Sequence, residues 1–330
     1  MQEIVINNNE AGQRFDKFLF KYFKEASSGF IYKMLRKKNI LLNGAKSDGK
    51  DKLNVGDTVK IFMSDETIKK FRGECGQQIL GQIEIDKLNI VYEDENVIII
   101  NKEAGMLSQK AEKNDISVNE YIISYLLKSN QLSKEQLKTF MPGVCNRLDR
   151  NTSGLIVAGK SLIGLQVMSD MFQNRTMDKY YLTIVSGKVR QKEKVKGYLV
   201  KDKKTNKVFI SKNENKNGQL IETEYEPLGF GEKVTLLKVK LLTGRAHQIR
   251  AHLASLQHPV IGDFKYGNRE INQYYKEHYG LKYQLLHSWK ISFPEMNKGC
   301  NSLSGKTITA QVPEIFQKII ADKITQGEFI

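Results

Sequence analysis

The sequence predicts an α+β protein built from a small N-terminal domain and a larger domain that mixes strands and helices. The chain has 330 residues, enough for two domains with a sizeable core. Apolar residues recur at helical spacing near the N-terminus, whereas strand-like runs alternate with helical segments after residue 90. Between them, residues 64–82 mix charges with three glycines and show little periodicity. We therefore expect domains at residues 1–63 and 85–330, joined by a linker at residues 64–84.

The N-terminal domain should contain two helices and a pair of short strands. Residues 15–23 and 31–35 place apolar side chains on one helix face, and serines precede the second segment as possible caps. Residues 40–42 and 59–62 predict strands. The second helix ends in Arg36, Lys37 and Lys38. These cations either contact a polyanion or simply solvate the helix end, where positive charge suits the dipole.

The larger domain should contain further strands and helices. Strand patterns occupy residues 90–93, 97–102, 155–158, 175–187 and 233–242, and helical patterns occupy residues 116–127 and 162–173. A short strand and a helix should follow residue 294. Polar, positively charged loops at residues 201–207 and 212–218 either touch phosphate or stay solvated.

The composition is that of a basic globular protein. Lysine and arginine number 52 against 37 acidic residues, which gives a net charge of +15 and suits a polyanionic partner, nucleic acid or an anionic membrane surface. No apolar run approaches the roughly 18 residues of a membrane span, and the first residues lack the pattern of a signal peptide. We therefore expect a cytoplasmic protein with no membrane partner. Three distant cysteines predict neither a disulfide framework nor a metal site.

One string in the larger domain sets a carboxylate between two cations. Arg147, Asp149 and Arg150 stand before the turn formers of residues 151–154, and an apolar run that predicts a buried strand follows. Asp149 should therefore lie on a loop at the edge of a sheet. Flanking guanidinium groups favour the ionised carboxylate, the form that attacks carbon or accepts a proton. The alternative is a solvated ion-pair cluster with no chemical role.

Residues 147–154, Arg-Leu-Asp-Arg-Asn-Thr-Ser-Gly, resemble the signature of the RluA-type pseudouridine synthases. Asn146 and Asn151 depart from the histidine and aspartate common in that family. The resemblance implies a catalytic domain on a mostly antiparallel mixed β-sheet with flanking helices, and an RNA isomerase that needs no external cofactor and no metal. It implies that Asp149 is catalytic, that the target uridine is flipped out of its helix, and that the active form is a monomer.

Other motifs extend the resemblance over nearly the whole chain. The string at residues 179–187 implies that Tyr181 faces the bound uracil, and the string at residues 243–253 implies that Arg250 lies against Asp149. Without the resemblance, the tyrosine would be core packing and the arginine a surface residue. The candidates for substrate binding are Arg147, Arg150, Lys179, Arg245, His247, Gln248 and Leu286. The histidines near position 250 lack the spacing of a metal site and favour a structural or RNA-facing role.

Residues 13–63 resemble the S4 RNA-binding domain, with the basic end of the second helix at the RNA. This domain order implies large-subunit (23S) ribosomal RNA as the substrate. Three alternatives remain: a pseudouridine synthase for transfer RNA, a non-catalytic RNA-binding or ribosome-assembly factor, and a hydrolase that releases uracil.

Residues 154–161 also match the pattern of a phosphate-binding P-loop. We reject a nucleotide cofactor here, because the four apolar residues inside the match favour an extended buried strand and not a loop with inward-turned N–H groups.

Overall fold

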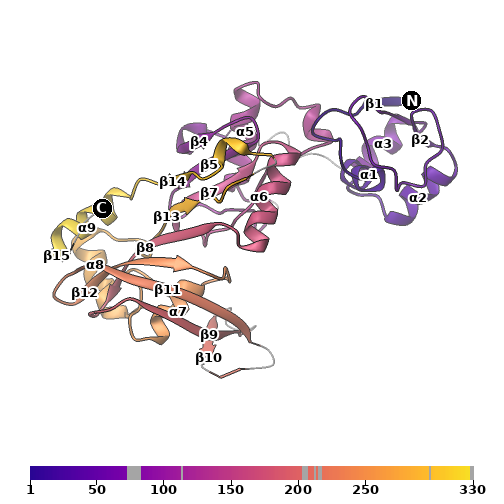
Figure 1. Cartoon of the computed structure of the whole chain (residues 1–330). Helices are drawn as coiled ribbons and strands as arrows, with labels where there is room; N and C mark the ends of the chain where they lie inside the picture. Colours follow the sequence, from indigo (N-terminus) through magenta and orange to yellow (C-terminus); the bar gives the residue numbers. More distant parts are fainter. Residues whose placement is uncertain are drawn as a thin grey trace.

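The described residues form two β-sheets, each with its own hydrophobic core (Figure 1). The computed structural model describes residues 1–72, 83–112, 114–202, 207–211, 213–214, 218–296 and 299–327. The α+β prediction is confirmed, with helices on both sheets. The smaller sheet and its helices, residues 2–72, are called the N-terminal module.

The N-terminal module is a three-stranded antiparallel sheet covered by helices. Its elements are β1 (Gln2–Val5), α1 (Phe15–Tyr22), α2 (Ser28–Arg36), β2 (Ile40–Leu42), β3 (Thr58–Ile61) and α3 (Asp65–Arg72). Both predicted helices and both predicted strands are present, and the Ser27 side chain accepts a hydrogen bond from Phe30 N as the cap of α2. Strand β1 was not predicted.

Part of the expected linker belongs instead to the N-terminal module. Residues 65–72 form α3, and its Ile68 is buried in the module's core. The ring of Phe71 packs on Phe30 with centroids 4.1 Å apart. The expectation was wrong here because α3 is mostly charged, and two apolar side chains give too weak a periodic signal. Residues 73–82 of the expected linker lie outside the described residues.

The larger sheet is mostly antiparallel, as the resemblance implied. Its main path runs β10-β9-β11-β12-β8-β13-β7-β5-β4, with one parallel pair, β13 with β7, among the pairings that the structure describes. The strands are β4 (Ile90–Glu93), β5 (Val97–Lys102), β6 (Gly143–Val144), β7 (Ser153–Gly159), β8 (Asp178–Ser186), β9 (Glu193–Lys201), β10 (Val208–Ser211), β11 (Gln219–Phe230), β12 (Val234–Leu241), β13 (Leu286–Ser292), β14 (Thr307–Thr309) and β15 (Gln326–Gly327).

Helices cover both faces of this sheet. They are α5 (Val118–Lys128), α6 (Leu162–Asn174), α7 (Gln248–Ser255), α8 (Arg269–Tyr279) and α9 (Glu314–Lys323), with short 3-10 turns η1 (Ile85–Lys87), η2 (Gln136–Lys138) and η3 (Asn301–Leu303). Helices α5 and α7 share a core with Ile156 and Tyr181. The other face packs on α6 beside Leu155 and on α8 and α9 beside Leu182. Alternation along β7 and β8 therefore directs Tyr181 to the α5 and α7 face.

The N-terminal module touches the larger part beside α6. Thr139 Oγ1 donates to Glu10 Oε1 at 2.5 Å, and the backbone N–H of Leu162 donates to Asn9 Oδ1 at 3.3 Å. Figure 1 shows the module at one end of the molecule, next to α6. The turn that carries Asp149 precedes β7, which runs from residue 153 to residue 159. The bonds to the module lie near the other end of β7.

The P-loop match is accounted for by close packing of a buried strand. Residues 153–159 form β7, all of them buried, as expected. A Cβ on Gly154 would lie 2.2 Å from the carbonyl oxygen of Ser288, and one on Gly159 would lie 2.3 Å from Leu165 N. The Lys160 ammonium donates to Glu93 Oε1 at 2.6 Å and to Asp94 O at 2.7 Å. The two glycines therefore allow close packing at the two ends of β7, and Lys160 forms hydrogen bonds just after the strand.

The polar loops at residues 201–207 and 212–218 lie only partly within the described residues, which leave out 203–206, 212 and 215–217. Their expected contact with phosphate stays a prediction. Among the helices that the structure describes, none combines the length and apolarity needed to cross a membrane.

Replacing Gly154 by Ala should lower the free energy of unfolding of the larger domain by about 2 kcal/mol or more, because the residue has φ +111° and no room for a methyl group. Urea unfolding followed by tryptophan emission measures this, since Trp289 in β13 is the only tryptophan of the chain. Gly244→Ala is the control, because no atom lies within 4 Å of the position that its methyl group would take. Equal stability of the two variants would contradict the packing argument.

Candidate active site

Asp149 lies in a short loop that leads into the central strand β7. The loop closes by a hydrogen bond from Thr152 N to Asp149 O at 3.0 Å, and Ser153 and Gly154 already belong to the strand. The turn is therefore shorter than predicted. Strand β7 lies between β13 and β5, so Asp149 stands at the end of an inner strand and not at the edge of the sheet.

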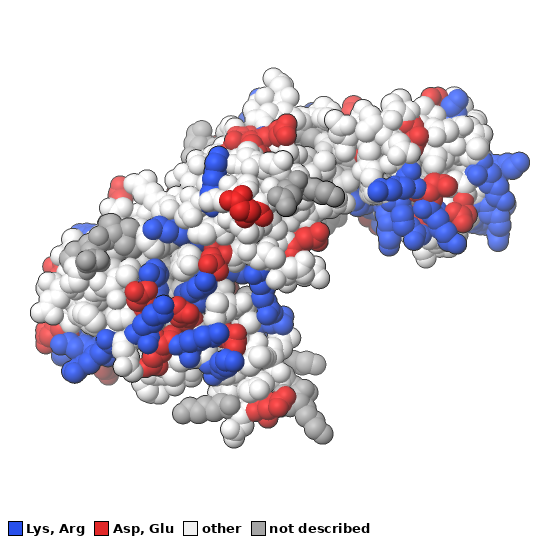
Figure 2. All heavy atoms as spheres, viewed as in Figure 1, with Lys and Arg blue, Asp and Glu red and all other residues white. Residues whose placement is uncertain are grey.

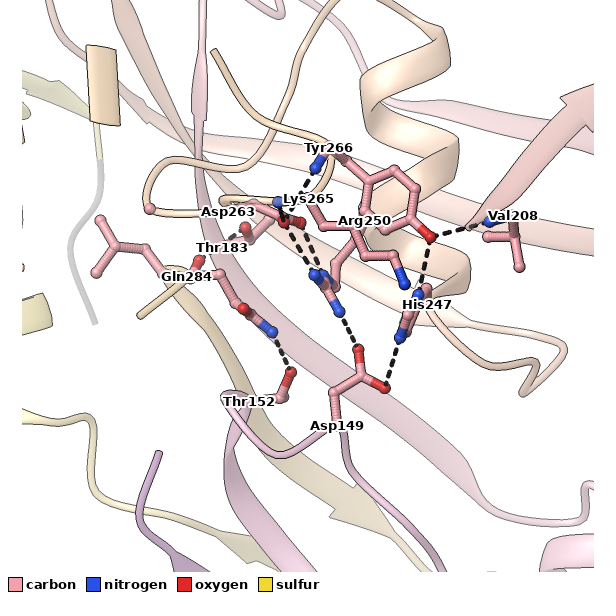
Figure 3. Close-up of polar contacts among 12 residues, drawn as sticks. Asp149, Thr152, Thr183, Val208, His247, Arg250, Asp263, Lys265, Tyr266 and Gln284 are labelled. Carbon is pink, nitrogen blue, oxygen red and sulfur yellow. Dashed lines mark hydrogen bonds and ion pairs between the residues drawn. The ribbon is translucent and has the colours of Figure 1, made fainter. Parts of the chain in front are cut away.

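The ion pair to Asp149 comes from the distant residue Arg250 (Figure 3). Arg250 Nη1 donates to Asp149 Oδ2 at 2.6 Å. The flanking residues Arg147 and Arg150 are exposed at the mouth of the same pocket, and Arg150 Nε donates to Gly105 O at 3.1 Å. Among the described residues, neither flanking arginine makes an ion pair with Asp149, whereas the contact from Arg250 that the resemblance implied is present. Neighbours in an extended loop point in different directions, whereas α7 brings Arg250 to Asp149 from across the sheet.

Arg250 is held on its other side by a buried carboxylate. Its Nε and Nη2 donate to Asp263 Oδ2 at 2.7 Å and Oδ1 at 2.9 Å, a bidentate pair in which Asp263 is fully buried. Asp263 also accepts from Lys265 N at 2.9 Å. Although burial alone would lower it, the pKa of Arg250 is raised above its ordinary value by its bonds to Asp263 and Asp149. The guanidinium therefore stays charged, with one nitrogen directed at Asp149 (Figure 3).

His247 approaches the second oxygen of Asp149. Its Nε2 lies 4.0 Å from Asp149 Oδ1, and its Nδ1 shares a hydrogen bond of 2.8 Å with the hydroxyl of Tyr266. Burial lowers the pKa of His247, so the neutral ring is favoured at neutral pH. The backbone of His247 is left-handed, with φ +56°, at the start of α7. A non-glycine residue in this conformation is typical of sites where geometry is imposed by function.

The buried Lys102 stabilises the backbone of the loop that carries Asp149. The Lys102 ammonium donates to the carbonyl oxygens of Glu103 at 2.8 Å, Met106 at 3.0 Å and Arg150 at 3.0 Å. Its side chain is 1% exposed, and burial lowers its pKa to about 7. Ser108 Oγ adds a bond to Leu148 O at 2.8 Å. The segment after β5 thus holds the backbone on both sides of Asp149.

Asp149, His247 and Arg250 line a pocket of about 680 Å³. Its wall consists of residues 107–111, 147–152, 181, 241, 244–250, 265 and 286. Asp149 is the one carboxylate among these lining residues, and it is accompanied by Lys110, Arg147, Arg150, Arg245, Arg250 and Lys265. A pocket of this size admits a nucleotide, and its cationic rim suits the phosphates that flank it.

Tyr181 and Leu286 form the apolar floor of the pocket. Both are buried, at 7% and 4% exposure, and they come from the adjacent strands β8 and β13. Burial raises the pKa of Tyr181 to about 12, partly offset by a hydrogen bond with Ser288 and reinforced by the charge of Asp149. The ring therefore carries a neutral hydroxyl at neutral pH. Tyr181 is at once a core residue and a pocket residue.

Two predicted substrate-binding residues have other surroundings. Lys179 is buried and does not belong to the pocket wall; its ammonium lies 5.9 Å from the ring centre of Phe172 in α6, the helix on the opposite face. That prediction was wrong, because Lys179 pairs with Ile291 of β13, whose side chain lies in the core that packs on α6. Gln248 lines the pocket, but its amide already bonds Thr243 Oγ1 at 2.8 Å and Glu222 O at 3.0 Å.

Four residues of the site received no role from the sequence. Asp263, Lys265 and Tyr266 lie in the turn before α8, and Lys102 ends β5. A charged residue at the end of an apolar strand was the available signal for Lys102. His252, by contrast, is a structural histidine. It is buried, its Nδ1 shares a hydrogen bond of 3.0 Å with Thr223 Oγ1, and burial lowers its pKa to about 4.

Comparison with known proteins points to one family. A family model described as RNA pseudouridylate synthase matches residues 96–255. An uncharacterized RNA pseudouridine synthase of Mycoplasma pneumoniae is 30% identical over 290 residues, which cover 86% of this chain and 86% of that protein. Ribosomal large subunit pseudouridine synthase C of Rickettsia felis is 30% identical over 302 residues, 88% of this chain and 92% of the relative.

A solved structure shares the fold of the larger domain. Human RNA pseudouridylate synthase domain containing 4 superposes with a TM-score of 0.58 at 19% identity, over 73% of this chain and 95% of the human chain.

The two carboxylates that contact Arg250 should differ in their effect on stability. Asp263→Asn should lower the free energy of unfolding by about 3 kcal/mol, because it leaves a buried guanidinium without its bidentate partner. Asp149→Asn should change it by less than about 1 kcal/mol, because the Asp149 side chain is one quarter exposed and asparagine still accepts a hydrogen bond. Urea unfolding followed by tryptophan emission measures both. Equal losses would show that Asp149 is as structural as Asp263.

Proposed function

The chain belongs to the RNA pseudouridine synthases, an RNA-modifying family of isomerases, and on that premise we propose that the pocket around Asp149 receives a single uridine flipped out of the RNA. A base within a helix is out of reach of any side chain at the floor of a pocket, so it must leave the stack first. The observation that carries the proposal is the contact of one carboxylate with one buried arginine inside this pocket.

Asp149 is the proposed catalytic carboxylate. The reaction breaks the bond between N1 of uracil and C1′ of the ribose, turns the base, and joins C5 to C1′ while the hydrogen on C5 leaves as a proton. Asp149 either attacks the sugar, attacks the uracil or removes a proton, and all three routes need the ionised form. Arg250 holds the orientation of the carboxylate by a hydrogen bond, because Asp263 fixes the guanidinium from the other side.

Tyr181 is proposed to stack on the detached uracil and keep it in the pocket. Its ring and Leu286 offer a flat apolar surface beside Asp149. Because burial raises the pKa of Tyr181 to about 12, its hydroxyl is a poor proton acceptor by itself, and stacking is the role that its surroundings favour. Arg147, Arg150, Arg245 and His247 are proposed to hold the phosphates and sugar at the rim.

We propose large-subunit ribosomal RNA as the substrate. The relative in Rickettsia felis and that in Vibrio vulnificus, which is 29% identical over 296 residues, both carry the ribosomal large subunit in their names. The N-terminal module is proposed to bind the same RNA in the manner of an S4 domain, through Arg36, Lys37 and Lys38 at the end of α2. All three are exposed. The expectation of a cytoplasmic monomer stays a prediction.

The distribution of surface charges supports RNA binding by the N-terminal module. Figure 2 shows groups of basic side chains on the N-terminal module with some acidic side chains among them, and basic and acidic side chains interspersed over the larger domain. Three lysines on or next to β9 and β12 are paired with glutamates of β11, at 2.8 Å for Lys192–Glu224, 2.8 Å for Lys196–Glu222 and 2.7 Å for Lys238–Glu226. Paired lysines attract phosphate weakly, so the module is the better candidate for the first encounter with RNA.

Replacing Asp149 by Asn should abolish isomerisation and retain RNA binding. Tritium release from a [5-³H]uridine-labelled, unmodified transcript of large-subunit ribosomal RNA measures turnover, because forming the new bond at C5 displaces that hydrogen. Pseudouridine mapping in ribosomal and transfer RNA from cells with and without the chain identifies the substrate. Sites in transfer RNA alone would overturn the ribosomal assignment, and free uracil would indicate a hydrolase. A non-catalytic binding factor predicts no release from the unmutated chain.

Replacing Arg36, Lys37 and Lys38 together by Gln should weaken RNA binding and reduce the slope of log affinity against log salt by about 2, since each phosphate contact contributes roughly 0.7 to 0.9. The matched control removes the same charge from Lys192, Lys196 and Lys238, whose ammonium groups are paired with glutamates. An equal change of slope in both variants would argue against a dedicated RNA contact on α2.

A further inference from the structure

A phenylalanine beside the pocket is exposed without a packing reason. Phe264 is 66% exposed, more than any other large hydrophobic side chain of the described residues except the terminal Met1. It stands between Asp263, which anchors Arg250, and Lys265, which lines the pocket. Exposed single apolar residues are common, but this one adjoins the site in which the RNA must be opened.

The turn that carries Phe264 is ordered by its neighbours. Asp263 Oδ1 accepts from the backbone N–H of Lys265 at 2.9 Å and of Tyr266 at 3.2 Å, and Gly267 N donates to Asp263 O at 2.8 Å. The hydroxyl of Tyr266 bonds His247 Nδ1 at 2.8 Å and accepts from Val208 N at 3.1 Å. The exposed ring is therefore presented on a fixed turn, which lowers the entropy cost of using it for binding.

We propose that the ring of Phe264 stacks on an RNA base next to the flipped uridine. The inference rests on the proposed function, in which the pocket around Asp149 receives that uridine. When a base leaves the stack, its neighbours lose a stacking partner, and an aromatic or apolar side chain can take the vacant place. Stacking is tolerant of sequence because every base has a flat face, so Phe264 contributes affinity and opening of the strand, not the choice of base.

The charges around Phe264 fit the same partner. Lys265 and Arg245 belong to the rim of the pocket, and the positive charges of Arg250 and Lys207 act on Lys265. Burial is the largest of the causes that lower the pKa of Lys265. An exposed ring next to a lysine of a cationic pocket rim suits single-stranded nucleic acid, with a base on the ring and phosphates on the cations of the rim.

Phe209 supplies a matched control on the neighbouring strand. It is 57% exposed and lies in β10, one residue after Val208. Val208 packs in one cluster with Ala251 of α7, so alternation along the strand turns Phe209 to the opposite face of the sheet. Phe209 thus has the exposure of Phe264 without its position beside the pocket.

Affinity for the unmodified large-subunit ribosomal RNA transcript tests the role of the ring. Phe264→Ala and Phe264→Leu should each weaken binding about 10-fold, because both remove the stacking surface, while Phe264→Trp should bind as well as the native chain. Phe209→Ala should bind within about twofold of the native chain, because Phe209 is not expected to stack on a base. Native-like affinity of Phe264→Ala, or of Phe264→Leu, would overturn the proposal. The melting temperature should stay unchanged in all variants because both side chains are exposed.

Tryptophan emission gives a direct readout that does not depend on turnover. The single native tryptophan, Trp289, is buried at 5% exposure, so a tryptophan side chain introduced at position 264 would dominate the response to RNA. In Phe264→Trp the emission should be quenched on adding the transcript, as expected for a ring stacked on a base, and in Phe209→Trp it should stay constant. An unquenched Phe264→Trp, or equal quenching in both, would overturn the proposal.

The proposed function and the stacking proposal for Phe264 can be disproved independently of each other. If the native chain releases no tritium, or Asp149→Asn releases as much as the native chain, the proposed function fails whatever the Phe264 variants do. If the native chain is active and Asp149→Asn is inactive, while the Phe264 variants bind and respond like the native chain, only the stacking proposal fails.

Discussion

The site depends on one guanidinium group held between two carboxylates. Arg250 is fixed by a bidentate bond to the fully buried Asp263, and its remaining nitrogen reaches Asp149 at 2.6 Å. Asp263 pairs with the charge of Arg250 inside the protein, where an unpaired guanidinium would be costly. Asp149, a quarter exposed, is the one carboxylate among the residues that line the pocket. Asp263 fixes the orientation of Arg250, and Arg250 in turn fixes the orientation of Asp149.

The surrounding fold brings these residues together from distant parts of the chain. Strand β7 presents Asp149, helix α7 carries Arg250, and the turn before α8 carries Asp263. The backbone around Asp149 is tied to the segment after β5 by the three carbonyl contacts of Lys102. Because β5 and β7 are paired strands, the loop and its support belong to the same sheet. Movement of the carboxylate would require several buried hydrogen bonds to break together.

The pocket and the basic residues at the end of α2 lie on different parts of the chain. The pocket combines one carboxylate, a buried tyrosine and a cationic rim, whereas the exposed basic residues at the end of α2 lie on a separate module. The module meets the larger domain at the far end of β7 through Glu10 and Asn9. RNA that touches both would lie along the molecule, with the exposed ring of Phe264 next to the pocket where the strand must open. Electrostatic attraction by the basic residues of α2 and stacking by Phe264 would then act at different places on the same RNA.

The sequence alone determined the family, the mostly antiparallel sheet and the identity of Asp149, Tyr181 and Arg250 as residues of one site, because short motifs around turns and strand ends can be read directly from the linear order of the chain. Hydrophobic periodicity likewise predicted α1, α2, α5, α6 and the buried strand β7. Only the tertiary structure showed that the flanking arginines make no ion pair with Asp149 among the described residues, that Lys179 lies outside the pocket wall, and that Lys102 and Asp263 support the site. Lys102 bonds a carbonyl 48 positions away and Asp263 bonds Arg250 across 13 positions. Such contacts depend on sheet register and helix packing, which local patterns do not encode.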